Sequence, residues 1–166
     1  GFKMSTKGDL YDTFYKNHLP FALTGAQQRV ILEINNDLTS GQQMNRLLQG
    51  DVGSGKTIVA LMIILIALGN GYQACMMAPT EVLAKQHFAS VSEMVSGLPI
   101  QVCLLTSNVK GKDKKQTLLG LANGTIHIAI GTHALIEDAV QFQNLGMVVI
   151  DEQHRFGVEQ RSKLWS

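Results

Sequence analysis

The chain has 166 residues, of which 45% are hydrophobic and 16% are charged, and its formal net charge at pH 7 is +1. This length supports one substantial core but is short for two, so we expect a single domain over residues 1–166. The small net charge excludes a general electrostatic attraction to polyanions, and any nucleic-acid contact must be local. The longest apolar run, residues 58–68, is shorter than the ~20 residues of a membrane-spanning helix.

Helical and strand-like patterns alternate along the chain, starting with a helix over residues 25–38. Apolar runs typical of strands follow at residues 46–49, 73–78, 102–105, 126–130 and 147–150. Helical patterns occupy residues 56–68, 81–95 and 114–122, and loops are expected at 39–41, 96–99 and 107–112. Strands that are apolar almost throughout are buried on both faces, and βαβ alternation indicates a parallel sheet between helices. The predicted fold class is therefore α/β, with three layers and a mostly parallel sheet.

Residues 50–57, Gly-Asp-Val-Gly-Ser-Gly-Lys-Thr, match the phosphate-loop pattern G-x-x-x-x-G-K-[ST] between a predicted strand and a predicted helix. Glycines let successive backbone N–H groups wrap a phosphate, and the following helix directs its positive end toward the same anion. We expect Lys56 to contact the β- and γ-phosphates of ATP and Thr57 to bind Mg²⁺. A glycine-rich turn with an incidental lysine is the alternative, and the flanking strand and helix argue against it. The loop residues expected to hold the nucleotide are Gly50, Gly53, Ser54, Gly55, Lys56 and Thr57.

Two adjacent carboxylates follow the last predicted strand, at Asp151 and Glu152. The carboxyl ends of parallel strands form the edge at which α/β proteins bind their ligands. Asp151 is suited to hold Mg²⁺, and Glu152 is suited to orient and deprotonate an attacking water molecule. With Lys56 these two residues form the predicted catalytic set, although acidic residues at a strand end also serve as helix caps.

Four further segments make the chain similar to ATP-dependent helicases of superfamily 2, and within them to the first motor domain of bacterial helicases that act on branched DNA. Residues 19–27 resemble the Q motif, 78–84 motif Ia, 131–136 motif Ib, and 151–158 motif II with its flank. The resemblance covers nearly the whole chain and implies a RecA-like P-loop fold that ends soon after motif II. Gln153 favours this group over the transcription–repair coupling translocases, which usually carry Glu there.

The resemblance also assigns roles to residues outside the phosphate loop. It implies that Gln27 reads the adenine edge and that Phe21 packs near the base, although Thr24-x-x-Gln27 fits a helix capping box equally well. Thr80 and Thr132 would donate to DNA phosphates, while an N-cap is an equal alternative for Thr80. The loop after the third strand departs from the Thr-Gly-Ser of the family, which puts a DNA contact there in doubt.

For the whole protein, the resemblance implies ATP and Mg²⁺ as cofactors and DNA as a partner, in recombination and the repair of stalled forks. It further implies a second motor domain and a DNA-binding domain in the same protein, and a bacterial cytoplasm. Because the arginine finger of the family comes from the second motor domain, we expect this chain alone to hydrolyse ATP very slowly. The alternatives are a transcription–repair coupling translocase and a nucleotide-gated binding ATPase that does not unwind DNA.

In the family, the strand that carries motif III inserts between the phosphate-loop strand and the motif II strand. This chain ends at Ser166, before that strand, so residues 46–49 and 147–150 must either close up or leave a gap. A gap would expose unpaired backbone groups and favour self-association.

The remaining polar residues with chemical potential have ordinary interpretations. Cys75 and Cys103 lie in apolar runs and are expected to be buried, reduced thiols. The histidines show no metal-ligand spacing, and we interpret His18, His87, His127 and His133 as ordinary surface or core residues. A basic cluster over residues 110–115 is at least as consistent with a solvated loop as with a phosphate-binding patch.

Overall fold

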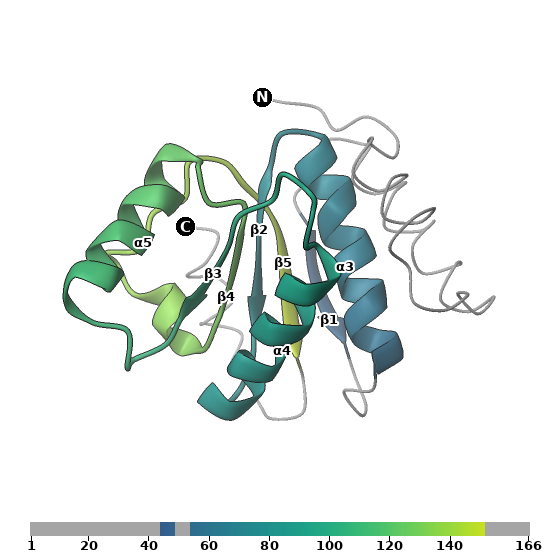
Figure 1. The fold of residues 1–166 in the computed structure, drawn as a ribbon, viewed down its shortest axis with the longest axis horizontal. Coiled ribbons are helices and arrows are strands. Elements are labelled where there is room, and N and C mark those ends of the chain that lie inside the picture. The colour runs from purple at the N-terminus through teal and green to yellow at the C-terminus, as the bar shows by residue number, and fades with distance from the viewer. Residues whose placement is uncertain (1–43, 49–53, 152–166) are drawn as a thin grey trace.

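The computed structural model describes residues 44–48 and 54–151, and Figure 1 shows their arrangement. The strands are β1 (Met44–Leu48), β2 (Gln73–Met77), β3 (Val102–Leu105), β4 (Ile128–Gly131) and β5 (Leu145–Asp151). The helices are α3 (Ser54–Gly69), α4 (Glu81–Met94), α5 (Gly111–Asn123) and the short 3₁₀ helix η1 (His133–Ile136). The predicted helix over residues 25–38 lies outside the described residues.

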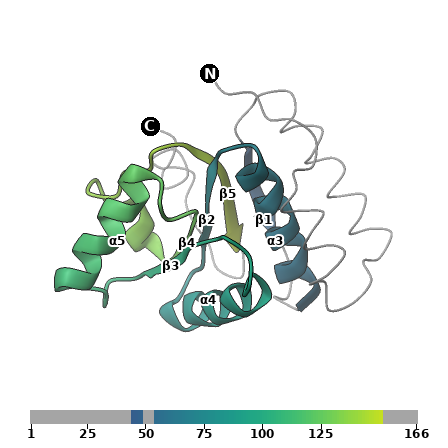
Figure 2. The same ribbon diagram turned by 45° about the horizontal axis from the view of Figure 1, so that its top comes forward.

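The five strands form one sheet in the order β1-β5-β2-β4-β3, and every pair of neighbours is parallel. Successive residues of a strand point to opposite faces, so each face of the sheet has its own core. Residues of α3 and α4 share one core with Ala74, Met76 and Val149, while α5 and η1 share the other with Cys75 and Ile150. Figure 2 shows α5 and α4 on different sides of the strands. The predicted three-layer α/β fold with a parallel sheet is confirmed.

Strand β1 pairs directly with β5 over five residues, from Met44 opposite Met147 to Leu48 opposite Asp151. Of the two alternatives expected for these strands, the structure has the closed one. The pairing gives the interior strand β5 a hydrogen-bonded neighbour on each side, β1 and β2. The exposed gap that would favour self-association is therefore absent from this sheet.

Residues 60–67 of helix α3 are buried on every side of the helix. Six consecutive residues, 61–66, have exposed fractions of 0%, and successive helical residues differ in direction by about 100°. A helix that is apolar all round is a core helix, which is what the apolar run at residues 58–68 predicts. Within the described part of the chain, no helix has both the length and the apolar character that a membrane span requires.

The predicted boundaries need three corrections. Helix α5 begins at Gly111, within the segment predicted as a loop, and its N-cap residue Lys110 makes no side-chain capping bond that the sequence could have signalled. Strand β4 begins at Ile128, two residues late, because the N–H groups of Ile126 and His127 donate instead to the carbonyls of Gly120 and Gln101. The sequence also gave no indication of η1. The other described helices and strands lie within one or two residues of their predicted ranges.

A hydrogen-bond network closes the amino-terminal edge of the sheet. The buried Gln73 side chain donates through Nε2 to the carbonyls of Leu121 (2.9 Å) and Ile126 (2.8 Å), and its Oε1 accepts from the N–H of Asn144 (2.8 Å). One side chain thus joins β2 to the end of α5 and to the segments that lead into β4 and β5. All three partners are backbone groups.

Candidate active site

The phosphate-loop segment lies between β1, which ends at Leu48, and α3, which begins at Ser54. The predicted site residues Ser54, Gly55, Lys56 and Thr57 form the first turn of α3. This turn carries no acidic residue that would offset the positive end of the helix from within the turn. Gly50 and Gly53 lie outside the described residues, as do Phe21, Gln27 and Glu152.

Asp151 is the last residue of β5 and lies opposite Leu48 in the register of the sheet. Neighbouring strands are about 4.8 Å apart, so this register brings Asp151 next to the strand that leads into the phosphate loop. Roughly a hundred residues separate the two motifs in sequence, and parallel pairing of β1 with β5 brings them to one edge. The side chain of Asp151 is nearly enclosed, because the residue is only 5% exposed.

The side chain of His87 contacts Asp151. The Nε2 atom of His87, on α4, lies 3.1 Å from Oδ2 of Asp151, and both side chains are only 7% exposed. Sequence analysis missed this pair, because the two residues are 64 positions apart and no spacing rule relates them. The strand order and the packing of α4 on the sheet bring them together. The only signal in the sequence is a histidine on the apolar stripe of a predicted helix.

Thr80, a predicted DNA contact, has a structural role at the start of α4. It is the N-cap residue, and its Oγ1 accepts a hydrogen bond from the N–H of Leu83 at 3.2 Å. The N-cap alternative is therefore confirmed. The residue is nevertheless exposed, so its hydroxyl is also available to a ligand at this edge.

Thr132, the second predicted DNA contact, is only 5% exposed. Its Oγ1 accepts from the N–H of Ala134 at 3.4 Å and starts η1, so the hydroxyl faces the protein more than solvent. The preceding Gly131 has no room for a side chain, because a Cβ atom there would lie 2.0 Å from the carbonyl oxygen of Leu105. The sequence Gly131-Thr132 thus allows β4 to end close against β3.

The loop after β3 is tied to the start of α4. Asn108 donates through Nδ2 to a carboxylate oxygen of Glu81 (2.5 Å), and Lys85 forms an ion pair with the same carboxylate (2.9 Å). The hydrogen bond from Lys85, and then that from Asn108, lowers the pKa of Glu81 below its ordinary value of 4.5. At the position where the loop departs from Thr-Gly-Ser, Asn108 therefore supplies a contact between this loop and the start of α4.

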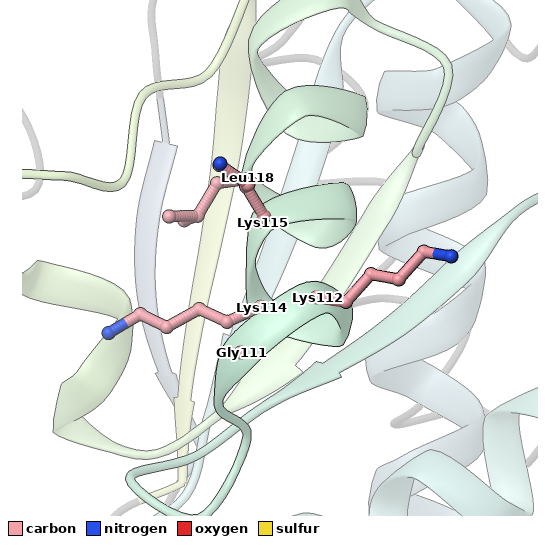
Figure 3. Close-up of a pocket in the computed structure, with 5 residues that line it drawn as sticks. All are labelled: Gly111, Lys112, Lys114, Lys115 and Leu118. Atoms are coloured by element: carbon pink, nitrogen blue, oxygen red, sulfur yellow. The ribbon is translucent and has the colours of Figure 1, made fainter.

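The predicted basic cluster does not converge on one point. An open hollow of about 550 Å³ is lined by Gly111, Lys112, Lys114, Lys115 and Leu118. Figure 3 shows the three lysine side chains leaving α5 in different directions. Lys114 forms an ion pair with Glu137, with 3.3 Å between Nζ and Oε2, and Lys112 and Lys115 are exposed. This arrangement favours the solvated-surface interpretation over a built phosphate site.

The two cysteines are buried and free, as predicted. Burial raises the pKa of both thiols to about 12, so neither is a nucleophile near neutral pH. Among residues 44–48 and 54–151, no group of three or more His, Cys, Asp or Glu side chains could hold a metal ion by itself. A metal at Asp151 would therefore need other ligands, which is typical of Mg²⁺ bound through phosphates and water.

Comparison with proteins of known function agrees with this arrangement. Residues 24–166 match the family model of the DEAD/DEAH box helicases. The chain is 56% identical to the ATP-dependent DNA helicase RecG of Bacillus subtilis over 146 residues, which cover 88% of this chain and 21% of that protein. It is 50% identical to RecG of Thermotoga maritima over 164 residues, 99% of this chain and 21% of that protein.

A solved structure of RecG bound to a three-way DNA junction has the same fold. The TM-score is 0.83 at 49% sequence identity, over 95% of this chain and 21% of the RecG chain. The chain therefore spans about a fifth of the length of these relatives. Because the family model matches most of its residues, the chain belongs to the DEAD/DEAH box helicase family.

Proposed function

We propose that this chain is the ATP-binding motor domain of a DNA helicase that acts on branched DNA. The observation that carries the proposal is the register between β1 and β5, with Leu48 opposite Asp151. It supports the proposal because a nucleotide-hydrolysing site needs the motif II carboxylate close to the strand that leads into the phosphate-loop segment. The identity of 50–56% to RecG and the likeness to RecG bound to a three-way junction support branched DNA as the substrate.

In this proposal Lys56, Thr57 and Asp151 hold Mg²⁺·ATP. Asp151 suits Mg²⁺ because a carboxylate is a hard oxygen donor, and it ends β5 beside the strand that leads into the phosphate-loop segment. The metal ion would neutralise the charge that develops on the phosphates during transfer. Glu152 would orient the attacking water, and Phe21 and Gln27 would hold the adenine.

The partners we propose are DNA, with Thr80 and Thr132 as contacts, and a second motor domain and a DNA-binding domain of the same protein. The exposure of Thr80 supports its proposed contact with DNA. Thr132 is buried, so little of its surface is available to contact DNA. Bacterial relatives and two free, buried cysteines are consistent with a reducing bacterial cytosol.

The nucleotide site is tested by measuring the affinity for Mg²⁺·ATP by calorimetry, on the natural polypeptide that contains this sequence. We expect Lys56→Ala to weaken Mg²⁺·ATP binding strongly, since it removes the cation that contacts the phosphates. Lys115→Ala, which removes an exposed lysine of α5, is the matched control and should leave binding unchanged. Equal affinity of the wild type and Lys56→Ala would refute the assignment.

The substrate is tested by ATP turnover with and without DNA. A helicase should hydrolyse ATP faster when a three-way junction is added and should separate its strands. A nucleotide-gated binding ATPase would show no stimulation by DNA. A transcription–repair coupling translocase would be stimulated by duplex DNA and would displace stalled RNA polymerase without separating the junction.

A further inference from the structure

His87 occupies a position that an apolar residue would normally fill. Helix α4 packs on the sheet through Ala84, His87 and Val91, which recur at intervals of three and four residues. A polar ring on such a stripe must find a partner inside the protein, because an unpaired buried polar group is costly. Its partner is the carboxylate of Asp151, at 3.1 Å.

The chemistry of the pair determines which of the two side chains donates the hydrogen bond. An ionised carboxylate only accepts hydrogen bonds, so the Nε2 atom of His87 carries the hydrogen and donates it to Oδ2 of Asp151. The donor is held on a rigid element, because α4 is a 14-residue helix whose start is fixed by the Thr80 cap. The hydrogen bond therefore restricts both the rotation and the position of the carboxylate.

A purely structural role would not need this particular donor. The buried carboxylate terminates β5, beside the strand that leads into the phosphate loop, and an imidazole from a separate helix holds it. Carboxylates that bind metal ions are commonly oriented by such outer hydrogen bonds, and loss of the outer partner typically weakens metal binding about 10- to 100-fold.

We propose that His87 is a positioning residue that holds the Asp151 carboxylate in the orientation in which it binds Mg²⁺·ATP. The inference rests on the proposed function, which makes Asp151 a ligand of the nucleotide-bound metal. His87 itself touches neither the metal nor the nucleotide. Its contribution is to set the carboxylate before the nucleotide arrives.

The test measures how much Mg²⁺ strengthens nucleotide binding. The affinity of a non-hydrolysable ATP analogue is measured by calorimetry on the natural polypeptide, once with Mg²⁺ and once with EDTA, and the ratio is the metal enhancement. His87→Leu should reduce the enhancement about 10- to 100-fold while the affinity in EDTA stays near that of the wild type. His87→Gln should retain most of it, because its Nε2 donor is as many bonds from Cα as that of histidine.

Two further variants complete the design. His87→Asn has an amide, but its side chain is one methylene too short to reach Asp151, so it should resemble His87→Leu. If the Leu variant does not fold, the comparison of His87→Gln with His87→Asn tests whether a donor at this distance is needed. His127→Leu is the matched control, because the His127 ring accepts a hydrogen bond from the backbone N–H of Gln101 on the opposite sheet edge. This variant should keep the full enhancement.

The outcomes separate this inference from the function on which it rests. If His87→Asn or His87→Leu keeps the full enhancement, or if His87→Gln loses as much as they do, His87 is not a positioning residue. An equal loss of affinity in Mg²⁺ and in EDTA would assign it to packing alone and also overturn the proposal. If Asp151→Asn leaves the enhancement intact, the metal role of Asp151 fails, and the proposed function with it.

Discussion

The polar side chains at the two edges of the parallel sheet include pairs with different kinds of partner. At the amino-terminal edge, Gln73 and His127 bond only backbone groups, those of residues 101, 121, 126 and 144. At the carboxyl-terminal edge, His87 and Asp151 bond each other. The first network joins neutral groups, and the second includes a carboxylate.

This difference distinguishes a structural edge from a functional one. Backbone partners stay fixed as long as the fold does, so Gln73 contributes to stability and has no donor left for a ligand. A buried carboxylate costs free energy through desolvation, and its hydrogen bonds offset only part of that cost. A fold that keeps Asp151 at this cost is consistent with a role for the charge beyond stability, which is the role we propose.

The largest effect should come from Glu152, the residue that follows Asp151. In the natural polypeptide, Glu152→Gln removes the proposed base but leaves the neighbouring carboxylate that we propose as a metal ligand, so nucleotide binding should persist. Turnover should fall by about 10²- to 10⁴-fold, the usual contribution of a general base. Steady-state ATP hydrolysis measures the turnover, and calorimetry measures the nucleotide affinity. Retained turnover would remove Glu152 from the mechanism and weaken the contrast between the edges.

The next effect is expected at the opposite edge. Gln73→Leu would leave the carbonyl of Ile126 and the N–H of Asn144 without their present partner, while the carbonyl of Leu121 would still accept from the N–H of Gln143. Each group left unsatisfied costs about 1 to 3 kcal/mol. We expect a loss of at least about 2 kcal/mol in unfolding free energy, seen as faster native-state hydrogen exchange of the β2 and β4 amides. Nucleotide affinity of the folded protein should be unchanged.

The exposed Gln116 on α5 provides the control, since Gln116→Leu changes the same atoms where solvent is available. Near-equal exchange in Gln73→Leu and Gln116→Leu would show that the amino-terminal network contributes little. A loss of nucleotide affinity in folded Gln73→Leu would contradict the separation of a structural from a functional edge.

Sequence analysis predicted what local pattern determines. The glycine-rich loop and the apolar run after it predicted α3 as residues 56–68, and the helix spans Ser54–Gly69. The strand before Asp151 was equally clear. By contrast, the start of α5 lacked a side-chain cap, and the start of β4 depends on where the N–H groups of Ile126 and His127 find acceptors in distant segments.

The partner of Asp151 was not predictable for a related reason. Its identification requires the strand order, which brings β5 beside β2, and the packing of α4 on one face of the sheet. In sequence, His87 and His127 look alike, since both are isolated histidines near apolar residues. Only the three-dimensional arrangement gives one a carboxylate and the other a backbone N–H.

A smaller effect is expected at Thr80, where the N-cap of α4 supports the element that carries His87. Thr80→Ala should lower stability by about 1 kcal/mol, because the N–H of Leu83 loses its acceptor. Exchange of the amides in the first turn of α4 would report the change directly. Thr80→Ser keeps the hydroxyl and is the control. If both variants exchange alike, the cap does not stabilise the helix.

The smallest effect concerns His127 and depends on pH. Burial lowers the pKa of its imidazole below the ordinary value of 6.5, and in the folded protein Nδ1 accepts the N–H of Gln101 at 2.9 Å. Below pH 6.5 the unfolded chain therefore binds more protons than the folded one, so this contribution to stability is present above pH 6.5 and is lost as the pH falls through the lowered pKa.

The pH effect is measured as a difference between proteins, because other groups titrate in the same range. Native-state hydrogen exchange of the β4 amides, recorded in steps below pH 6.5, should show the wild type losing more stability than His127→Gln, which has no titrating ring. An NMR titration of the His127 ring should place its pKa below 6.5. A pKa above that value, or an identical pH dependence in both proteins, would show that protonation does not compete with the bond to Gln101. The amino-terminal edge would then be insensitive to the charge of its histidine.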